Sequence, residues 1–320
     1  MILEGNISAG KSTLAQRLGP LLGCKVFLEP TLVNPYLEKF YAEPAKYALK
    51  MQLWLLRQRF YTYVNALKLM LSSESGVILD RSVFSDKVFA DQCRADGLIS
   101  AEGYEYYMAL RARMLAALPA PHVTLYLAVA PEECHKRIRS RSRNCESGIP
   151  LEYLAGLNSC YDAFLKDMAD FGSTVVSHDW NEFGDAADIA AQVMASLPAG
   201  SAPSVSNMTT LAGNLIDPQY VRSFVASEPR IKDAMVLPYV VEGVEDSDPL
   251  PTPIDFDLEA ELTAKQAPPP SSDDLVFEIT FDDASSSSSS SADNDAGVDA
   301  GVDPTFTSSD PVSRQLFTES

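Results

Sequence analysis

The first thirteen residues contain the spacing G-x-x-x-x-G-K-S, the clearest chemical signal in the chain. In this motif two glycines let backbone N–H groups close around phosphate oxygens, at the positively polarised start of a helix. The lysine ammonium reaches the β- and γ-phosphates, and the serine hydroxyl binds Mg²⁺. The motif therefore predicts a site for a nucleoside triphosphate, with the serine as a metal ligand. Its residues are Gly5, Asn6, Ile7, Ser8, Ala9, Gly10, Lys11, Ser12 and Thr13.

Three charged residues follow apolar segments that have the composition of buried strands. Glu29 lies at the end of the segment 25–30, and Asp80 and Arg81 follow the apolar run 76–79. Functional groups of a doubly wound sheet collect at the carboxyl ends of its strands, which places all three residues beside the phosphate loop. Asp80 is then a second metal ligand, direct or through water, and Arg81 stabilises charge on a transferring phosphoryl group. A surface or helix-capping acid is the less favoured interpretation of Glu29.

A basic cluster interrupts the nearly neutral first part of the chain. Five of the eight residues from 136 to 143 are Lys or Arg. One interpretation is a nuclear-localisation or nucleic-acid patch. The other is a lid over a triphosphate, because Arg137, Arg141 and Arg143 span less than two helical turns and could converge on one anion. We favour the lid, since the cluster follows a strand–helix unit and precedes Gly148-Ile149-Pro150.

Apolar segments and helical patterns alternate along residues 1–197, which indicates an α/β protein. Continuous apolar strands are what a parallel sheet covered on both faces requires. We therefore predict a parallel sheet of about five strands flanked by helices on both faces, the architecture of a P-loop enzyme. The predicted strands are 1–3, 25–30, 76–82, 122–129 and 174–177. One predicted helix begins after residue 10, and two others begin at 85–86 and at 131. The remaining predicted helices span 44–71, 104–118, 151–171 and 185–197.

The long helix predicted for 44–71 carries two polar residues within an apolar surface. Residues 53–56 make it apolar nearly all round, as expected in a core or a subunit interface. Gln52 and Arg59 lie seven residues apart, on the same face two turns along. Polar groups on such a face need partners, so we expect both in a site; a solvated edge is the alternative for Arg59.

The composition divides the chain near residue 197. Residues 1–199 hold 20 Lys+Arg and 22 Asp+Glu, a net charge of −2, whereas residues 200–320 hold 5 and 22, a net charge of −17. We predict a folded domain at 1–197 and an acidic, Ser/Pro-rich, low-complexity tail at 198–320 that is mostly disordered. Apolar islands at 220–225, 235–241 and 275–281 could be docking motifs or transient helices or strands, and plain disorder is favoured. A tail that is only a tether, or an arm for an unknown partner, can be removed after Leu197 without loss of activity.

Composition also disfavours several classes of protein. The net charge is −19 and no basic patch offers the footprint of a duplex-binding protein, so we expect no nucleic-acid partner. Neither a membrane-spanning run nor a signal or transit segment is present, so we expect no membrane association. The five cysteines and three histidines lack zinc-site spacing. Scattered cysteines are typical of reduced thiols, which predicts a cytoplasmic protein and leaves a nuclear location open.

Four motifs occur together and in order: the loop 5–13, Glu29-Pro30, Asp80-Arg81-Ser82, and the arginine cluster followed by 148–154. Over residues 1–197 this set resembles the deoxynucleoside kinase family, and within it the deoxycytidine/deoxyguanosine kinase branch. One departure is Asp80, where that family has Glu; the shorter acid is similar to that of herpesviral thymidine kinases. The resemblance implies ATP- and Mg²⁺-dependent phosphorylation of the 5′-hydroxyl of a deoxyribonucleoside, in nucleotide salvage, by a homodimer.

The resemblance also implies a role for each matched residue. Glu29 takes the proton from the sugar 5′-hydroxyl, and Tyr41 and Glu146 grip the 3′-hydroxyl. Gln52 bonds the base edge, and the pair Arg59 and Asp86 favours deoxycytidine, deoxyguanosine or deoxyadenosine over thymidine. The remaining residues hold phosphates (Lys11, Arg81, Arg137, Arg141, Arg143) or shape the nucleoside pocket (Met51, Leu55), where Leu55 replaces a smaller residue.

Two other classes compete with this interpretation. A thymidylate kinase shares the phosphate loop and an acid-Pro motif, but an arginine that binds a monophosphate normally precedes the acid, and here Leu28 stands there. A non-catalytic relative, such as the kinase-like accessory subunit of respiratory complex I, uses the fold for assembly. The presence of Lys11, Glu29 and Arg81 argues against that alternative, although the long acidic tail keeps an added scaffolding role open.

Overall fold

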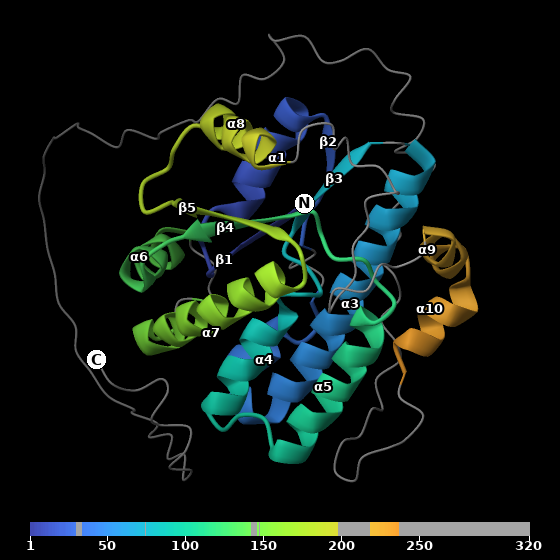
Figure 1. Cartoon of the computed structure of the whole chain (residues 1–320). Coiled ribbons are helices and arrows are strands. Elements are labelled where there is room, and N and C mark those ends of the chain that lie inside the picture. Colours follow the sequence, from blue (N-terminus) through green and yellow to red (C-terminus); the bar gives the residue numbers. More distant parts are fainter. Residues whose placement is uncertain (30–33, 74, 142–145, 147, 198–217, 237–320) are drawn as a thin grey trace, which may run out of the picture. The chain divides into compact units, whose positions relative to one another are not determined.

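A computed structural model describes residues 1–29, 34–73, 75–141, 146, 148–197 and 218–236 (Figure 1). Within these ranges the strands are β1 (Ile2–Gly5), β2 (Cys24–Phe27), β3 (Gly76–Asp80), β4 (Val123–Ala128) and β5 (Thr174–Asp179). The helices are α1 (Lys11–Leu22), α2 (Leu37–Ala42), α3 (Pro44–Ser73), α4 (Asp86–Ala95), α5 (Ala101–Leu115), α6 (Pro131–Arg141), α7 (Leu151–Asp170), α8 (Ala186–Ser196), α9 (Pro218–Val225) and α10 (Glu228–Ala234).

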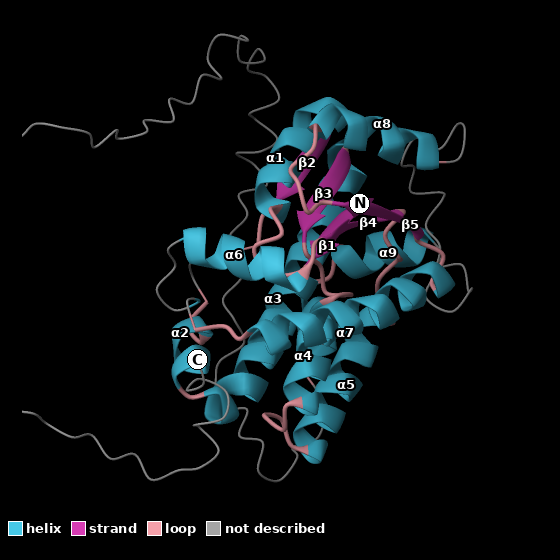
Figure 2. Cartoon of the chain, turned by 90° about the vertical axis from the view of Figure 1, so that its left-hand side faces the viewer, coloured by secondary structure: helices cyan, strands magenta, loops and turns pink. Residues whose placement is uncertain are grey.

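The strands form one parallel sheet in the order β2-β3-β1-β4-β5. Helices α1 and α8 cover one face, and α3 and α7, with α4 and α5 beside them, cover the other (Figure 2). This confirms the predicted α/β architecture. Because β1 and β3 are neighbours, the loop after β1 and the residues after β3 emerge at the same edge. The order of the sheet therefore places the phosphate loop next to Asp80 and Arg81.

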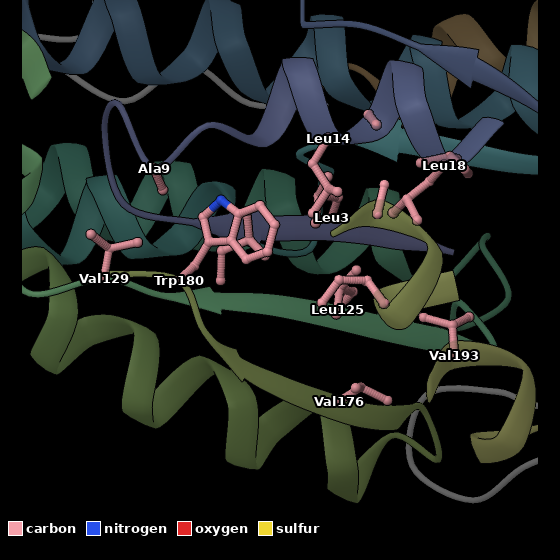
Figure 3. Close-up of a cluster of buried hydrophobic side chains, with 14 of the residues drawn as sticks. Leu3, Ala9, Leu14, Leu18, Leu125, Val129, Val176, Trp180 and Val193 are labelled. Carbon is pink, nitrogen blue, oxygen red and sulfur yellow. The ribbon is translucent and has the colours of Figure 1, made fainter. Parts of the chain in front are cut away.

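The main core lies between the sheet and helices α1 and α8 (Figure 3). Leu3, Leu14 and Leu125 are at most 2% exposed there, so strand and helix meet through tightly packed apolar side chains. Leu14 and Leu18 of α1 face this core, whereas Leu21 is 53% exposed. The reason is that Pro20 and the left-handed Gly23 bring the helix to its end at this point.

The second strand differs from its prediction. The segment 25–30 was expected to be a buried strand, but β2 ends at Phe27 and is mostly half-buried. It is an edge strand whose only partner in the sheet is β3, with Phe27 opposite Leu79. Glu29 therefore lies in the following loop, two residues past the strand, and the intervening Leu28 is 42% exposed.

Helix α3 is the longest element on the second face. Its bounds agree closely with the predicted span, and half of its residues are buried around its whole circumference. α5 begins three residues earlier than predicted, because Ser100 caps it by accepting a hydrogen bond from the Gly103 amide, 3.1 Å away. No helix in the described ranges combines the length and apolarity that a membrane crossing needs.

A short segment within the predicted tail is folded. Helices α9 and α10 pack against α3 and α5, and Val221, Phe224 and Ile231 are at most 3% exposed. The apolar island at 220–225 is thus a helix, because two short amphipathic helices together cover an apolar face that neither could cover alone. Residues 198–217 and 237–320, with the island 275–281, lie outside the described part of the chain.

The close approach of α1 to β2 depends on Gly19. A Cβ added at Gly19 would lie 2.7 Å from Val26 Cγ2 and 3.2 Å from the Cys24 carbonyl oxygen. In an open helix, Gly→Ala stabilises by about 0.5–1 kcal/mol. Here we expect Gly19→Ala to lower the free energy of unfolding by about 1–3 kcal/mol, because the β-branched Val26 cannot rotate away easily.

Urea denaturation of wild type, Gly19→Ala, Val26→Ala and the double variant measures this effect. Most of the penalty should disappear in the Val26→Ala background, since the overlapping methyl is gone. Equal penalties in both backgrounds would show that the contact with Val26 is not the cause.

Candidate active site

The phosphate loop is held in shape before any ligand arrives. Asn6 ties it to α7, because its side-chain amide donates to the Leu154 carbonyl at 2.8 Å and to Asn158 Oδ1 at 2.6 Å. Lys11 Nζ donates to the Asn6 carbonyl at 2.8 Å, and Gly10 has φ +91° just before α1 begins. The loop therefore presents a preformed ring of backbone groups at a helix N-terminus, which is the arrangement that binds phosphate.

Glu29 is shared by two arginines. Arg59 donates to Oε1 through both Nε, at 3.2 Å, and Nη2, while Arg81 Nε lies 3.3 Å from Oε2. Burial alone would raise the pKa of Glu29, but the charges of Arg59 and Arg81 outweigh it and hold the pKa at about 2. Glu29 is therefore an oriented carboxylate that stays ionised at any physiological pH.

Arg59 continues the network into the protein. Its Nη1 donates to Asp86 Oδ1, and Tyr107 Oη donates to Asp86 Oδ2 at 2.9 Å. Asp86 is completely buried, and this burial raises its pKa although Arg59 and Tyr107 favour the ionised form. A buried guanidinium with two carboxylate partners is locked in place.

Arg81 connects Glu29 to the phosphate loop. Its backbone has φ +65°, an uncommon conformation for a residue with a side chain, and its guanidinium lies over the Phe89 ring at 4.6 Å. Its Nη1 donates to Tyr161 Oη, which in turn donates to the Gly5 carbonyl at 2.9 Å. The left-handed backbone turns the side chain back across the carboxyl ends of the strands.

Ser12 and Asp80 meet as predicted. The Ser12 hydroxyl donates to Asp80 Oδ2, while Asp80 Oδ1 is buried without a hydrogen-bond partner among the described residues. Two oxygen donors, one of them unsatisfied, suit Mg²⁺, which typically takes one or two protein oxygens and completes its shell with phosphates and water. Within the described ranges no cluster of three or more His, Cys, Asp or Glu side chains offers a denser metal site.

These groups open into one cavity of about 540 Å³. Beside the phosphate loop, its walls include Glu29, Arg59, Asp80 and Arg81. A space of this size fits a small organic ligand. A nucleophile bound at Glu29 and a triphosphate bound at the loop would thus share one enclosure. The other predicted residues on its walls are Ile7, Ser8, Gly10, Lys11, Ser12, Thr13, Tyr41, Met51, Leu55, Arg137, Arg141 and Glu146.

Comparison with known proteins agrees with the family resemblance found in the sequence. The family model for deoxynucleoside kinase matches residues 1–198. The chain belongs to the deoxynucleoside kinase family. A deoxyguanosine kinase of Dictyostelium discoideum is 60% identical over 185 residues, which cover 58% of this chain and 65% of that protein. The chain thus spans less than two thirds of that relative's length.

The chain is also similar to a mitochondrial protein and to a solved kinase structure. The mitochondrial subunit 10 of the NADH dehydrogenase (ubiquinone) 1 alpha subcomplex of Bos taurus is 31% identical over 190 residues, covering 52% of this chain and 55% of that protein. A solved structure of deoxyadenosine kinase from M. mycoides with bound dCTP is 26% identical and superposes with a TM-score of 0.53. That match covers 62% of this chain and all of the other.

The structure does not place every predicted kinase residue on the cavity wall. Gln52 is fully buried, with its Nε2 3.9 Å from Cys93 Sγ, and its Oε1 has no hydrogen-bond partner among the described residues. Asp86 is also behind the wall, where it contacts Arg59. Arg143 lies outside the described residues. The nucleoside roles of Gln52 and Asp86 and the phosphate role of Arg143 remain predictions.

The predicted arginine lid divides into two parts. Arg137 is already engaged, since its Nη2 donates to the carbonyls of Trp180 at 2.9 Å and Asn181 at 2.7 Å. Arg141 at the end of α6 is exposed and lines the cavity. Arg137 is therefore tied to the phosphate loop and to the residues after β5, whereas Arg141 is an exposed arginine on the cavity wall, and its contact with a triphosphate stays a prediction.

Sequence reasoning missed Phe183. Its ring is 67% exposed, stacks under the Arg137 guanidinium at 4.2 Å, and lies so close to Gly10 that a Cβ there would be 2.9 Å from it. An exposed aromatic ring at the mouth of a phosphate loop offers a surface for a planar base. Its position shortly after β5, at the carboxyl end of the sheet, was the available signal.

Sequence reasoning also missed Glu4. This residue of β1 is fully buried, and the Ser82 hydroxyl donates to its Oε1 at 2.9 Å. Burial raises the pKa of Glu4 to about 7, an effect that the positive charge of Arg81 offsets only in part. Glu4 therefore lies under the arginine network as a carboxyl group that ionises near neutral pH.

Glu4 should make stability fall as pH rises. The unfolded chain releases this proton near the ordinary pKa of 4.5 and the folded chain only near 7, so stability is lost between these values and stays lost above them. Since one pKa unit corresponds to about 1.4 kcal/mol, the loss is at most on the order of 3 kcal/mol. We expect Glu4→Gln, which cannot ionise, to gain stability over wild type between pH 5 and pH 8.

Denaturant unfolding of both proteins at several pH values checks this, with Glu182→Gln on an exposed loop as the matched control. A difference between wild type and Glu4→Gln that does not change with pH would contradict the assignment.

Proposed function

We propose that this kinase transfers the γ-phosphoryl group of ATP to the 5′-hydroxyl of a deoxyribonucleoside, with deoxyguanosine as the preferred acceptor. The observation that carries the proposal is the shared cavity, in which the Glu29 carboxylate faces the phosphate loop between Arg59 and Arg81. Membership of the family supports the reaction, and the Dictyostelium relative supports the choice of base.

The chemistry requires mainly positioning and charge stabilisation, because phosphoryl transfer passes through a loose transition state. Lys11 and the loop amides hold the β- and γ-phosphates, and Arg81 faces the charge that develops on the transferring group. Arg141, on the cavity wall at the end of α6, adds a positive charge near the phosphates. Ser12 and Asp80 would hold Mg²⁺, which supplies neutralisation of phosphate charge when bound.

Glu29 accepts the proton of the 5′-hydroxyl. With a pKa of about 2 it is a weak base, but it is fully ionised and its two arginines fix its direction. In a loose transition state the hydroxyl gives up its proton late, so orientation matters more than basicity. Arg81 then stabilises the product phosphate, which appears beside it.

Glu29→Gln should lower turnover by roughly 10²–10⁴-fold, because the amide cannot accept the proton. Nucleotide affinity should remain, since Lys11 and the loop are unchanged. The measurement is kcat from an ATP-coupled assay alongside the Kd for ATP, with Glu38→Gln on the exposed side of α2 as the matched control. Full turnover by Glu29→Gln would exclude Glu29 as the base.

The base should be selected at the inner end of the cavity. Arg59 offers hydrogen-bond donors that suit a purine keto oxygen, and Asp86 sets its orientation. Behind the wall, Gln52 Oε1 is an acceptor without a hydrogen-bond partner among the described residues. Guanine presents a keto group and N–H donors together. Thymine has no exocyclic amino group, so it would leave buried polar groups unpaired.

The test is phosphorylation of deoxyguanosine, deoxyadenosine, deoxycytidine, thymidine and dTMP side by side, with Glu29→Gln as the blank. We expect kcat/KM for deoxyguanosine to exceed that for thymidine by at least about tenfold, or 1.4 kcal/mol. Thymidine preference would contradict the role of Arg59 and Asp86, and turnover of dTMP alone would indicate a thymidylate kinase. Folded, ATP-binding protein that is inactive on all five would instead favour the accessory-subunit alternative.

The cytoplasmic location is a proposal that rests on the cysteines. Among the described residues, Cys24, Cys93, Cys134 and Cys160 are free thiols. Reduced thiols are typical of the cytosol, which supports the predicted cytoplasmic location.

A further inference from the structure

The chain turns sharply where it leaves β3, and Arg81 makes the turn. The Arg81 amide still follows the sheet, because it donates to the Leu3 carbonyl at 3.0 Å. Its φ of +65° then lies in the left-handed region, which is unfavourable for a residue with a side chain. A conformation of this kind persists only where the surrounding contacts hold it. The residues that follow Arg81 must therefore be anchored.

The anchor is Ser82, which is 1% exposed. Its hydroxyl donates to Glu4 Oε1 at 2.9 Å and accepts from the Phe84 amide at 3.2 Å. Its carbonyl accepts from the Ser85 hydroxyl at 3.1 Å. The bonds with Phe84 and Ser85 stay within the turn itself, whereas the bond with Glu4 ties the turn to β1.

Glu4 is well placed to connect two parts of the site. It is the residue of β1 directly before Gly5, the first glycine of the phosphate loop. Its carboxylate accepts the hydrogen bond that anchors the turn after Arg81. One residue thus joins the strand that carries the phosphate loop to the turn that carries the arginine of the transfer step.

Glu4 is also a costly residue in its position. It follows the apolar residues Ile2 and Leu3 and is, like them, completely buried. Burial raises the pKa of Glu4 to about 7, so the fold keeps an acid where its charge is disfavoured. An apolar residue of similar size would fill the same space without that cost. A residue that breaks a packing rule in this way is expected to serve function.

We propose that Glu4 is a positioning residue for phosphoryl transfer, which acts through the Ser82 hydroxyl to hold the turn that aims the Arg81 guanidinium. The inference rests on the proposed function, in which Arg81 stabilises charge on the transferring group. Glu29 and Tyr161 hold the guanidinium end of Arg81, and Ser82 holds the backbone from which it extends. Since a misplacement of about 1 Å can lower a rate on the order of 10²-fold, the backbone anchor matters for the reaction.

Four single variants separate the hydrogen bond from the charge. Glu4→Leu removes the acceptor at similar size, and Ser82→Ala removes the donor. Glu4→Gln removes the ionisable group but keeps an oxygen that accepts from Ser82. Thr124→Val is the matched control, because it also removes a buried hydroxyl that is hydrogen-bonded, at 2.7 Å to a serine hydroxyl, but in β4.

The measurements are kcat per ATP-binding site and the Kd for ATP. We expect Glu4→Leu and Ser82→Ala to lower kcat by about tenfold or more, because the guanidinium loses its aim. Their Kd for ATP should stay within about threefold of the wild-type value, since Lys11 and the loop amides are unchanged. Glu4→Gln and Thr124→Val should keep kcat within about threefold of wild type.

A double variant tests whether the effect passes through Arg81. In the Arg81→Ala background, Ser82→Ala should cause no further loss of the residual turnover, because there is no guanidinium left to aim. A merely structural role of the hydrogen bond would lower turnover by the same factor in both backgrounds.

Three results would overturn the inference while leaving the proposed function intact. They are full kcat in Ser82→Ala, equal losses in the two backgrounds, and a loss in Glu4→Gln as large as that in Glu4→Leu, which would assign the effect to charge. Wild-type enzyme that phosphorylates no deoxyribonucleoside would overturn the proposed function and the inference together. If Glu4→Leu fails to fold, Ser82→Ala, Glu4→Gln and the double variant still decide.

Discussion

The shared carboxylate of Glu29 is the interaction on which the site depends. Arg59 and Arg81 are both buried, and a buried guanidinium is tolerable only with partners of opposite charge. Glu29 serves both, from a loop that follows an edge strand. The position of this loop, and not that of the strand, therefore sets the distance between the proposed base and the phosphate loop. Arg59 and Arg81 thus both have a carboxylate partner in Glu29, and Glu29 stays ionised.

A second consequence concerns the other end of each arginine. Arg59 reaches Asp86 of α4 and, through Asp86, Tyr107 of α5, while Arg81 reaches Tyr161 of α7. Three helices are thereby joined to one carboxylate. Tyr161 also donates to the Gly5 carbonyl, so the phosphate loop is part of the same network. One hydrogen-bond network thus connects Glu29, both arginines, three helices and the phosphate loop.

The sequence predicted those parts of the site that follow from a local pattern. The phosphate loop and the positions of Asp80 and Arg81 beside it were anticipated, because strand ends in a parallel sheet converge. Arg59 was expected in a site because it is a polar residue on an apolar helix face. The clamping of Asn6 by α7, the left-handed Arg81 and the pairing of Glu29 with Arg59 were not. Each depends on residues more than twenty positions apart, or on a backbone conformation that residue type alone does not indicate. Glu4 was overlooked for a similar reason, since its environment is made by β3 and not by its own strand.

The tail shows that an average over composition can hide a short folded segment. Averaged over residues 198–320, a charge excess and low-complexity runs outweigh a few apolar side chains. Yet Val221, Phe224, Ile231 and Met235 lie close together in the sequence and are buried where α9 packs on α3 and α10 packs on α5. A short segment folds when a preformed surface supplies the apolar partners that it lacks itself. Because α3 also carries Arg59, the same helix contributes to the candidate site and supports the fold of this segment.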